Sequence, residues 1–187
     1  MRRRLWWLSW PNSLTLLRVA LVPVIAALLI ADTGGDRWWA FAVFVFAALT
    51  DTIDGWLARR YQGVTRWGQL ADPIADKILI IGSLGILAWL GELPWWAVVV
   101  IVVREVAVTL QRVLLVRRDV VMPASGLGKL KTLSQVAAVT LYLLPSAPRG
   151  LAEAVLWVAV AITVLSGVRY ALGRSSTQAR EPESDRP

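Results

Sequence analysis

The chain has 187 residues, of which 57% are apolar and 18% are charged, and it carries a net charge of +7. This length suits one domain. Soluble domains are ~45–50% apolar and ~25% charged, so the composition excludes a disordered chain and indicates an integral membrane protein. The sequence has no Cys and no His, which excludes disulfides, thiol catalysis, thiolate zinc sites and histidine bases. Any chemistry must depend on carboxylates, hydroxyls, Lys or Arg.

Six apolar segments predict an all-α fold, an integral membrane bundle of six transmembrane helices. Each continuous apolar core has only about 11–15 residues, whereas crossing the hydrocarbon takes ~20. Buried helices of a soluble protein are the alternative, but too little polar sequence remains to surround them. We therefore expect spanning helices that carry polar residues at one end. The segments cover residues 13–32, 37–58, 73–91, 94–116, 130–146 and 151–172.

The regions outside the segments complete the predicted organisation. We expect residues 1–11 to form an arm on the membrane surface, residues 12–172 to form the membrane domain, and residues 173–187 to be a polar, disordered tail. The linkers after the first, third and fifth segments hold only two basic residues, Arg37 and Arg149. The other side holds Arg2, Arg3, Arg4, Arg59, Arg60, Arg66, Arg117, Arg118, Arg174 and Arg180.

This charge asymmetry predicts the topology and the location. Basic residues favour the cytoplasmic side of a membrane protein. Both termini are therefore expected in the cytoplasm, in a multi-pass protein of the cytoplasmic membrane. In a soluble protein the charge of +7 would suggest nucleic acid. Here the basic residues flank apolar segments, so we expect membrane lipids and no nucleic acid as partners.

Four aspartates are the candidate chemistry of the chain. Asp51 and Asp54 end the second segment and are three residues apart, whereas Asp72 and Asp76 begin the third and are four apart. Each spacing places both carboxylates on one helix face. A short loop joins the two helices, so the four carboxylates are expected to converge at the cytoplasmic side. Ionisable residues inside membrane segments indicate function.

Clustered carboxylates repel one another unless cations lie between them. Oxygen ligands without His or Cys favour a hard divalent cation such as Mg²⁺ or Mn²⁺. The alternative is structural, in which each Asp forms an ion pair with Arg59, Lys77 or Arg104. A cation transporter is a second alternative. Transporters usually place such groups near the midplane between repeated halves, whereas these aspartates lie near one side and no internal repeat is visible.

The aspartates belong to a longer pattern, which reads Asp51-Thr52-Ile53-Asp54-Gly55-Trp56-Leu57-Ala58-Arg59 and continues with Gly68, Asp72 and Asp76. This pattern resembles the signature of the CDP-alcohol phosphatidyltransferase family, D-x2-D-G-x2-A-R-x8-G-x3-D-x3-D, at all eight specified positions. A chance match has a probability on the order of 10⁻¹⁰ per start site at typical residue frequencies.

The resemblance extends along most of the chain. Residues 11–18 are similar to the family's entry into its first helix. Residues 104–109 with Arg112, and residues 123–132 with Gln135, resemble the phosphatidylglycerophosphate synthase branch of the family. Arg169 departs from that branch, in which an acidic residue is expected at this position.

The resemblance implies a function and roles for the residues of the signature. It implies a six-helix fold, transfer of the phosphatidyl group from CDP-diacylglycerol to an alcohol with release of CMP, two divalent cations and a homodimer. Metal ligands would be Asp51, Asp54, Asp72 and Asp76, and Asp76 would also be the general base on the acceptor hydroxyl. Residues implied to hold the CDP part are Asp51, Asp54, Gly55, Ala58, Arg59, Thr65 and Gly68.

A second group of basic residues bears on the acceptor alcohol. Arg104 and Arg112 are eight residues apart in the fourth segment, about 80° apart around a helix. Lys129 and Lys131 open the fifth segment. Together they are expected to bind the phosphate of sn-glycerol 3-phosphate. Alternatively, the two lysines are anchors that face lipid head groups.

Other acceptors remain possible within the family. A cardiolipin synthase would use phosphatidylglycerol, and a phosphatidylinositol phosphate synthase would use an inositol phosphate. A phosphomonoester requires the basic group, whereas phosphatidylglycerol requires a wider lipid entrance.

Overall fold

The computed structural model describes residues 10–31, 33–61, 68–116 and 126–178, with side chains for residues 17–31, 33–50, 77–111 and 128–169. These described residues form six helices and short linkers, with no strand among them. The predicted all-α fold with six helices is therefore confirmed. The helices are α1 (Trp10–Ala31), α2 (Asp36–Tyr61), α3 (Gly68–Trp89), α4 (Trp95–Val116), α5 (Gly126–Leu143) and α6 (Arg149–Gln178).

The helix bounds lie close to the predicted segments. The largest extension is at α6, which continues to Gln178, six residues beyond the boundary predicted at residue 172. Helix α1 begins at Trp10, inside the predicted arm. Residues 1–9 of the arm and residues 179–187 of the tail lie outside the described residues.

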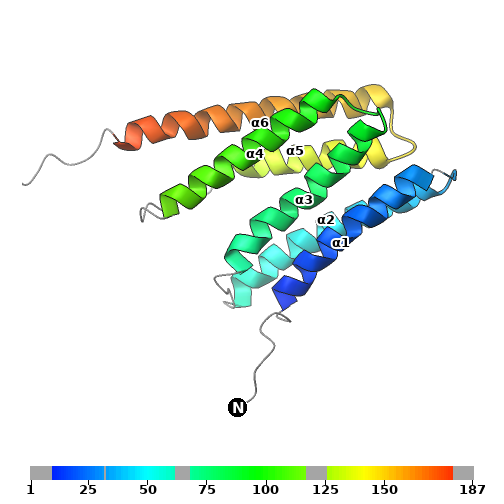
Figure 1. Cartoon of the computed structure of the whole chain (residues 1–187), viewed down its shortest axis with the longest axis horizontal. Helices are drawn as coiled ribbons and strands as arrows, with labels where there is room; N and C mark the ends of the chain where they lie inside the picture. Colours follow the sequence, from blue (N-terminus) through cyan, green and yellow to red (C-terminus); the bar gives the residue numbers. More distant parts are fainter. Residues whose placement is uncertain (1–9, 32, 62–67, 117–125, 179–187) are drawn as a thin grey trace, which may run out of the picture.

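The six helices form two groups that meet near the linkers (Figure 1). Helix α1 packs against α2 and α3, and α6 packs against α4 and α5. Helix α3 joins the groups through contacts with α4 and α5, and α2 also contacts α5. In Figure 1 the groups converge where the linkers α1–α2, α3–α4 and α5–α6 lie, and they diverge toward the other end. The fully buried side chains between the helices include Ile25, Phe44, Leu84, Leu87, Ile101 and Leu143.

The linker after α3 shows why the helix ends where it does. Gly91 has a φ of +74°, a conformation that costs little only for glycine. The N–H of Glu92 donates to the carbonyl of Leu87 at 2.9 Å, and the N–H of Gly91 donates to that of Ala88 at 3.0 Å. These two bonds form a Schellman motif, which satisfies the last carbonyls of the helix. The motif directs Glu92 toward the neighbouring linkers.

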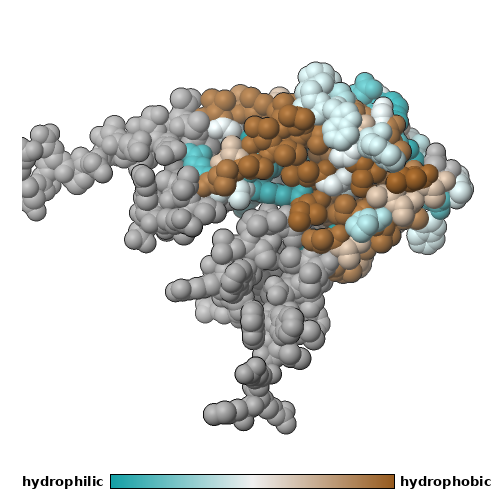
Figure 2. All heavy atoms as spheres, viewed as in Figure 1, coloured by the Kyte–Doolittle hydropathy of each residue, from teal (hydrophilic) through white to brown (hydrophobic). Residues whose placement is uncertain are grey.

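The outer surface of the described bundle is strongly apolar. Figure 2 shows brown, hydrophobic residues over much of one face, with paler and hydrophilic residues gathered near the linker end. Along α4, exposed side chains include Val99, Val103, Val106 and Leu110. Among the described residues, Arg149–Arg169 is the one helix long and apolar enough to cross a membrane, while Leu17–Ala31 and Lys77–Trp89 are shorter apolar helices. Such a surface is unusual for a soluble monomer.

An ion-pair cluster joins the linkers. Arg37 donates from Nη1 to Oε1 of Glu92 at 2.8 Å and from Nη2 to Oε2. It also donates to the carbonyl of Tyr142 at 2.8 Å. Arg149 contacts Oε2 of Glu92 at 2.8 Å, and its guanidinium lies 5.6 Å from the centroid of the Tyr142 ring. The carboxylate of Glu92 therefore connects the α3–α4 linker to α2 and α6, and the two arginines extend the cluster to Tyr142 of α5.

This cluster predicts a pH dependence of stability. Burial tends to raise the pKa of Glu92, but the hydrogen bonds and charges of Arg37 and Arg149 outweigh it, so the pKa lies below its ordinary 4.5. A carboxyl whose pKa is lowered by folding stabilises the fold above its unfolded-state pKa, and this contribution is lost as the pH falls through the folded-state pKa. The unfolding temperature in detergent should therefore fall below about pH 4.5.

The Glu92→Gln variant provides the comparison for this pH dependence. Near neutral pH its free energy of unfolding is expected to be lower by about 1–3 kcal/mol, because the two arginines lose a charged acceptor. Its unfolding temperature should fall accordingly. It should also show a smaller fall in unfolding temperature on acidification. Parallel pH profiles for wild type and variant would show that another group is responsible.

Candidate active site

The four aspartates lie near two helix ends that follow one another in the chain, the C-terminal end of α2 and the N-terminal end of α3. Asp51 and Asp54 lie toward the end of α2, and Asp72 and Asp76 lie in the first turns of α3. Helical backbone at both places supports the predicted spacing, in which each pair shares one helix face. Tyr61 and Gly68 are seven residues apart, so these helix ends are separated by at most about 25 Å. The side chains of all four aspartates lie outside those that the structure describes.

The other predicted CDP-binding residues follow the same division. Gly55, Ala58 and Arg59 lie on α2 and Gly68 begins α3, whereas Thr65 lies outside the described residues. Among the side chains that are described, no group of three or more His, Cys, Asp or Glu residues could hold a metal ion. That search did not include the four aspartates, so their role as metal ligands stays a prediction.

Helices α4, α5 and α6 each bury one stripe of side chains, and each stripe has apolar members toward one end of the bundle and polar members toward the other. The side chains of each stripe recur at a spacing of three or four residues, as expected for one face of a helix. The polar members lie toward the end of the bundle opposite the α3–α4 and α5–α6 linkers. The stripes are Ala97, Ile101, Glu105 and Val108 on α4; Lys131, Gln135, Ala138 and Tyr142 on α5; and Ala152, Leu156, Ala159, Thr163 and Ser166 on α6.

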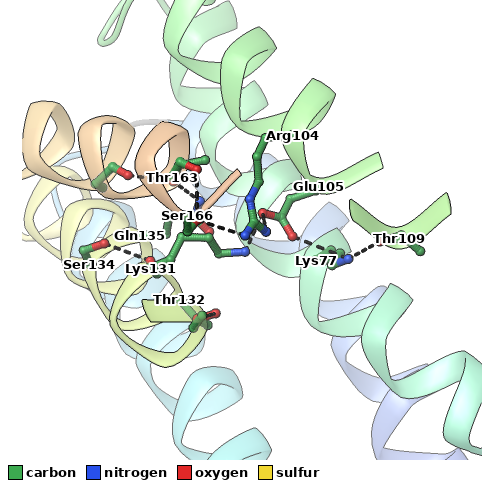
Figure 3. A network of polar contacts seen from close by, with 12 residues as sticks. Lys77, Arg104, Glu105, Thr109, Lys131, Thr132, Ser134, Gln135, Thr163 and Ser166 are labelled. Atoms are coloured by element: carbon green, nitrogen blue, oxygen red, sulfur yellow. Dashed lines mark hydrogen bonds and ion pairs between the residues drawn. The ribbon is translucent and has the colours of Figure 1, made fainter. Parts of the chain in front are cut away.

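Glu105 is the centre of a buried cluster of charges (Figure 3). Its side chain is only 4% exposed. Lys131 of α5 donates to Oε1, and Arg104 donates to the same oxygen at 3.0 Å. Lys77 of α3 lies 3.4 Å from Oε2 and donates to the hydroxyl of Thr109. We name these four residues, Lys77, Arg104, Glu105 and Lys131, the basic cluster.

Helix α6 holds Arg104 from the other side. Nη2 of Arg104 donates to the hydroxyl of Ser166 at 2.9 Å, and that hydroxyl donates to the carbonyl of Thr163 at 2.9 Å. A Cβ atom at Gly167 would lie 3.2 Å from Cγ of Arg104. Glycine at this position therefore lets the arginine lie close against α6. The network continues to α5, where Gln135 donates to the hydroxyl of Thr163 at 2.9 Å.

One residue of the basic cluster, Lys77, lies next to the aspartate signature in the chain. Lys77 directly follows Asp76 on α3, so their Cα atoms are ~3.8 Å apart. Because Lys77 contacts Glu105, the backbone of Asp76 must lie close to the cluster. Three cations and one carboxylate give the cluster a formal charge of +2. An anion that contacts the cluster itself would therefore meet a surplus of positive charge.

Comparison with known proteins decides the family. The model for the CDP-alcohol phosphatidyltransferase family matches residues 8–165, which includes both the aspartate signature and the basic cluster. The chain belongs to this family.

Relatives of this phosphatidyltransferase carry more specific names. A probable phosphatidylglycerophosphate synthase of Mycobacterium tuberculosis (strain ATCC 25618 / H37Rv) is 46% identical over 164 residues, which cover 85% of this chain and 78% of the relative. The CDP-diacylglycerol–glycerol-3-phosphate 3-phosphatidyltransferase of Bacillus subtilis (strain 168) is 40% identical over 177 residues, covering 86% and 92%. A protein of the same name from Rickettsia typhi is 35% identical over 170 residues, covering 86% and 93%.

The structure brings together only part of the predicted acceptor site of this phosphatidyltransferase. Arg104 and Lys131 meet at Glu105. Lys129 is exposed at the start of α5, away from the described contacts of the cluster, because two residues correspond to a rotation of about 200° around a helix. Arg112 lies on α4, and its side chain is outside those described.

Sequence reasoning missed four members of the network: Lys77, Glu105, Thr163 and Ser166. Lys77 was considered only as an ion-pair partner for an aspartate, whereas its described contacts go to Glu105 and Thr109. Glu105, Thr163 and Ser166 were given no role. The signal for Glu105 was its place among apolar residues of the fourth segment, since an ionisable residue inside such a segment indicates function.

Proposed function

We propose that this protein transfers the phosphatidyl group from CDP-diacylglycerol to sn-glycerol 3-phosphate, forming phosphatidylglycerophosphate and CMP. Family membership supports the reaction type. The names of relatives at 40–46% identity support the two substrates. The observation that carries the choice of acceptor is the basic cluster, with its three cations on one carboxylate.

Charge favours a phosphomonoester as the ligand of this cluster. A phosphomonoester carries about −1.5 to −2 charges at pH 7, which matches the surplus of +2. The phosphodiester of phosphatidylglycerol carries one negative charge and would leave part of that surplus unbalanced. Arginine and lysine at partly buried positions bind phosphate through charge-assisted hydrogen bonds. Arg104, at 12% exposure, and Lys77, at 28%, are buried enough for such bonds to be strong.

The aspartate signature supplies the remaining requirements of the reaction. Asp51, Asp54, Asp72 and Asp76 offer only oxygen ligands, which suit Mg²⁺ or Mn²⁺. Bound divalent cations would neutralise charge on the diphosphate of the donor. Asp76 accepts the proton of the acceptor hydroxyl, a role supported by its position directly before Lys77 in the chain. Gly55, Ala58, Arg59, Thr65 and Gly68 hold the CDP part.

The membrane is the setting that fits a lipid-linked donor. We propose that all six helices span the cytoplasmic membrane, with both termini and the active site on the cytoplasmic side. Helices α1, α3 and α4 each have 22 residues, which corresponds to about 33 Å against a hydrocarbon core of about 30 Å. The donor then keeps its acyl chains in the bilayer while its diphosphate reaches the aspartates. The family resemblance also leads us to expect a homodimer.

An acceptor panel tests the proposed function. Purified protein is mixed with CDP-diacylglycerol, Mg²⁺ or Mn²⁺, and one acceptor at a time: sn-glycerol 3-phosphate, phosphatidylglycerol or an inositol phosphate. We expect CMP release with glycerol 3-phosphate and none without a divalent cation. Release with phosphatidylglycerol but not with glycerol 3-phosphate would instead identify a cardiolipin synthase.

A further inference from the structure

Glu105 is the only carboxylate that the described contacts bring to Lys77, Arg104 and Lys131. These three cations come from three helices, α3, α4 and α5. Both carboxylate oxygens are used, since Oε1 accepts from Arg104 and Lys131 and Oε2 faces Lys77. The position of each cation therefore depends on the same carboxylate.

Burial strengthens the dependence of the three cations on the carboxylate of Glu105. The side chain of Lys131 is 8% exposed and that of Glu105 is 4% exposed. Like charges at such depth repel strongly, because little water screens them. Without the carboxylate, repulsion would push the three cations apart. Glu105 also reduces the formal surplus of the cluster from +3 to +2.

The cations keep hydrogen-bond donors that Glu105 does not use. An arginine has five N–H donors and a lysine ammonium has three. Arg104 gives one described bond to Glu105 and one to Ser166. Within the described part of the chain, its Nε is buried and has no hydrogen-bond partner. The donors left for an anion are therefore the second N–H groups of Nη1 and Nη2 of Arg104 and the unused N–H groups of the two lysines.

We propose that Glu105 is a positioning residue for the acceptor: it fixes the spacing of Lys77, Arg104 and Lys131 so that their remaining donors bind one phosphate. This inference rests on the proposed function and deepens it. It holds that a residue with a negative charge, like the acceptor itself, sets the geometry of the acceptor site. Glu105 itself does not touch the acceptor phosphate, since two like charges in contact would repel.

The test separates acceptor binding from folding. Glu105→Gln keeps the shape of the side chain but removes its charge and turns one oxygen into a donor. We expect the KM for glycerol 3-phosphate to rise at least about 10-fold, with the KM for CDP-diacylglycerol changed less than about twofold. Glu105→Asp keeps the charge and should give an intermediate KM for glycerol 3-phosphate.

Thr163→Val is the matched control. It removes a buried hydroxyl from the same network, the acceptor of Gln135, without changing a contact to a cation. Its unfolding temperature is expected to fall while both KM values stay near those of wild type. A purely structural role for Glu105 would make Glu105→Gln behave like this control, with less folded enzyme and unchanged KM values.

The outcomes distinguish this inference from the proposed function. If wild type uses glycerol 3-phosphate and Glu105→Gln keeps its KM for it, the positioning role is wrong and the proposed function stands. If wild type uses a different acceptor, the proposed function is wrong, and the same comparison made with that acceptor decides the role of Glu105. If Glu105→Gln does not fold, the KM of Glu105→Asp decides: a value equal to that of wild type overturns the inference.

Discussion

Replacing Asp76 by asparagine is expected to slow CMP release by at least about 100-fold while the protein stays folded. General bases contribute typically 10²–10⁴-fold to a rate, and the carboxamide of asparagine cannot accept the proton of the acceptor hydroxyl. The change also removes one anionic oxygen ligand from the predicted divalent cation site. The measurement is single-turnover CMP release from CDP-diacylglycerol with saturating glycerol 3-phosphate.

Asp36→Asn is the matched control for Asp76→Asn. Asp36 is the first residue of α2, at the linker end, where its carboxylate accepts a hydrogen bond from the N–H of Thr33 at 3.0 Å. The control makes the same chemical change far from the signature and should keep the wild-type rate. Unfolding temperatures of both variants report on folding. An Asp76→Asn enzyme with wild-type turnover would exclude Asp76 as the general base.

Arg104→Ala is expected to weaken binding of the water-soluble acceptor and to spare the lipid donor. Hydrogen bonds to charged groups contribute about 1.5–3 kcal/mol, which corresponds to a rise of about 10- to 150-fold in the KM for glycerol 3-phosphate. The donor is expected to depend on Asp51, Asp54 and their neighbours instead. Steady-state kinetics with each substrate varied in turn would measure the two KM values.

Arg149→Ala provides the comparison for Arg104→Ala. It removes the same side chain from the opposite end of the bundle, where Arg149 contacts Glu92 and is 54% exposed. This control should lower the unfolding temperature without changing either KM. If Arg104→Ala raised both KM values equally, Arg104 would act on the shape of the whole site and not on the acceptor phosphate.

Much of the fold was predictable because the chain alternates between long apolar segments and short polar linkers. The number of helices and their approximate bounds follow from that alternation. The helical backbone at both aspartate pairs was equally predictable, and spacings of three and four residues on a helix place each pair on one face without knowledge of the neighbours. Both predictions depend only on local geometry.

The basic cluster was only partly predictable, because it depends on how each helix is rotated about its axis. Lys129 and Lys131 are both lysines at the start of α5, yet of the two only Lys131 continues the buried stripe of Gln135, Ala138 and Tyr142. The stripe could have been recognised in the sequence from its spacing. The meeting of Lys131 with Glu105, 26 residues away, could not, because it requires the packing of α4, α5 and α6 against one another.

The ion pairs around Glu92 have a mechanical consequence for the opposite end of the molecule. They tie α2, the α3–α4 linker, α5 and α6 together at one point, while the two groups of helices separate away from it (Figure 1). A rigid rod held at one end moves mainly by pivoting about that end. A rotation of one group against the other about Glu92 would therefore change the distance between Lys77 of α3 and Glu105 of α4, the ion pair that joins the groups within the basic cluster.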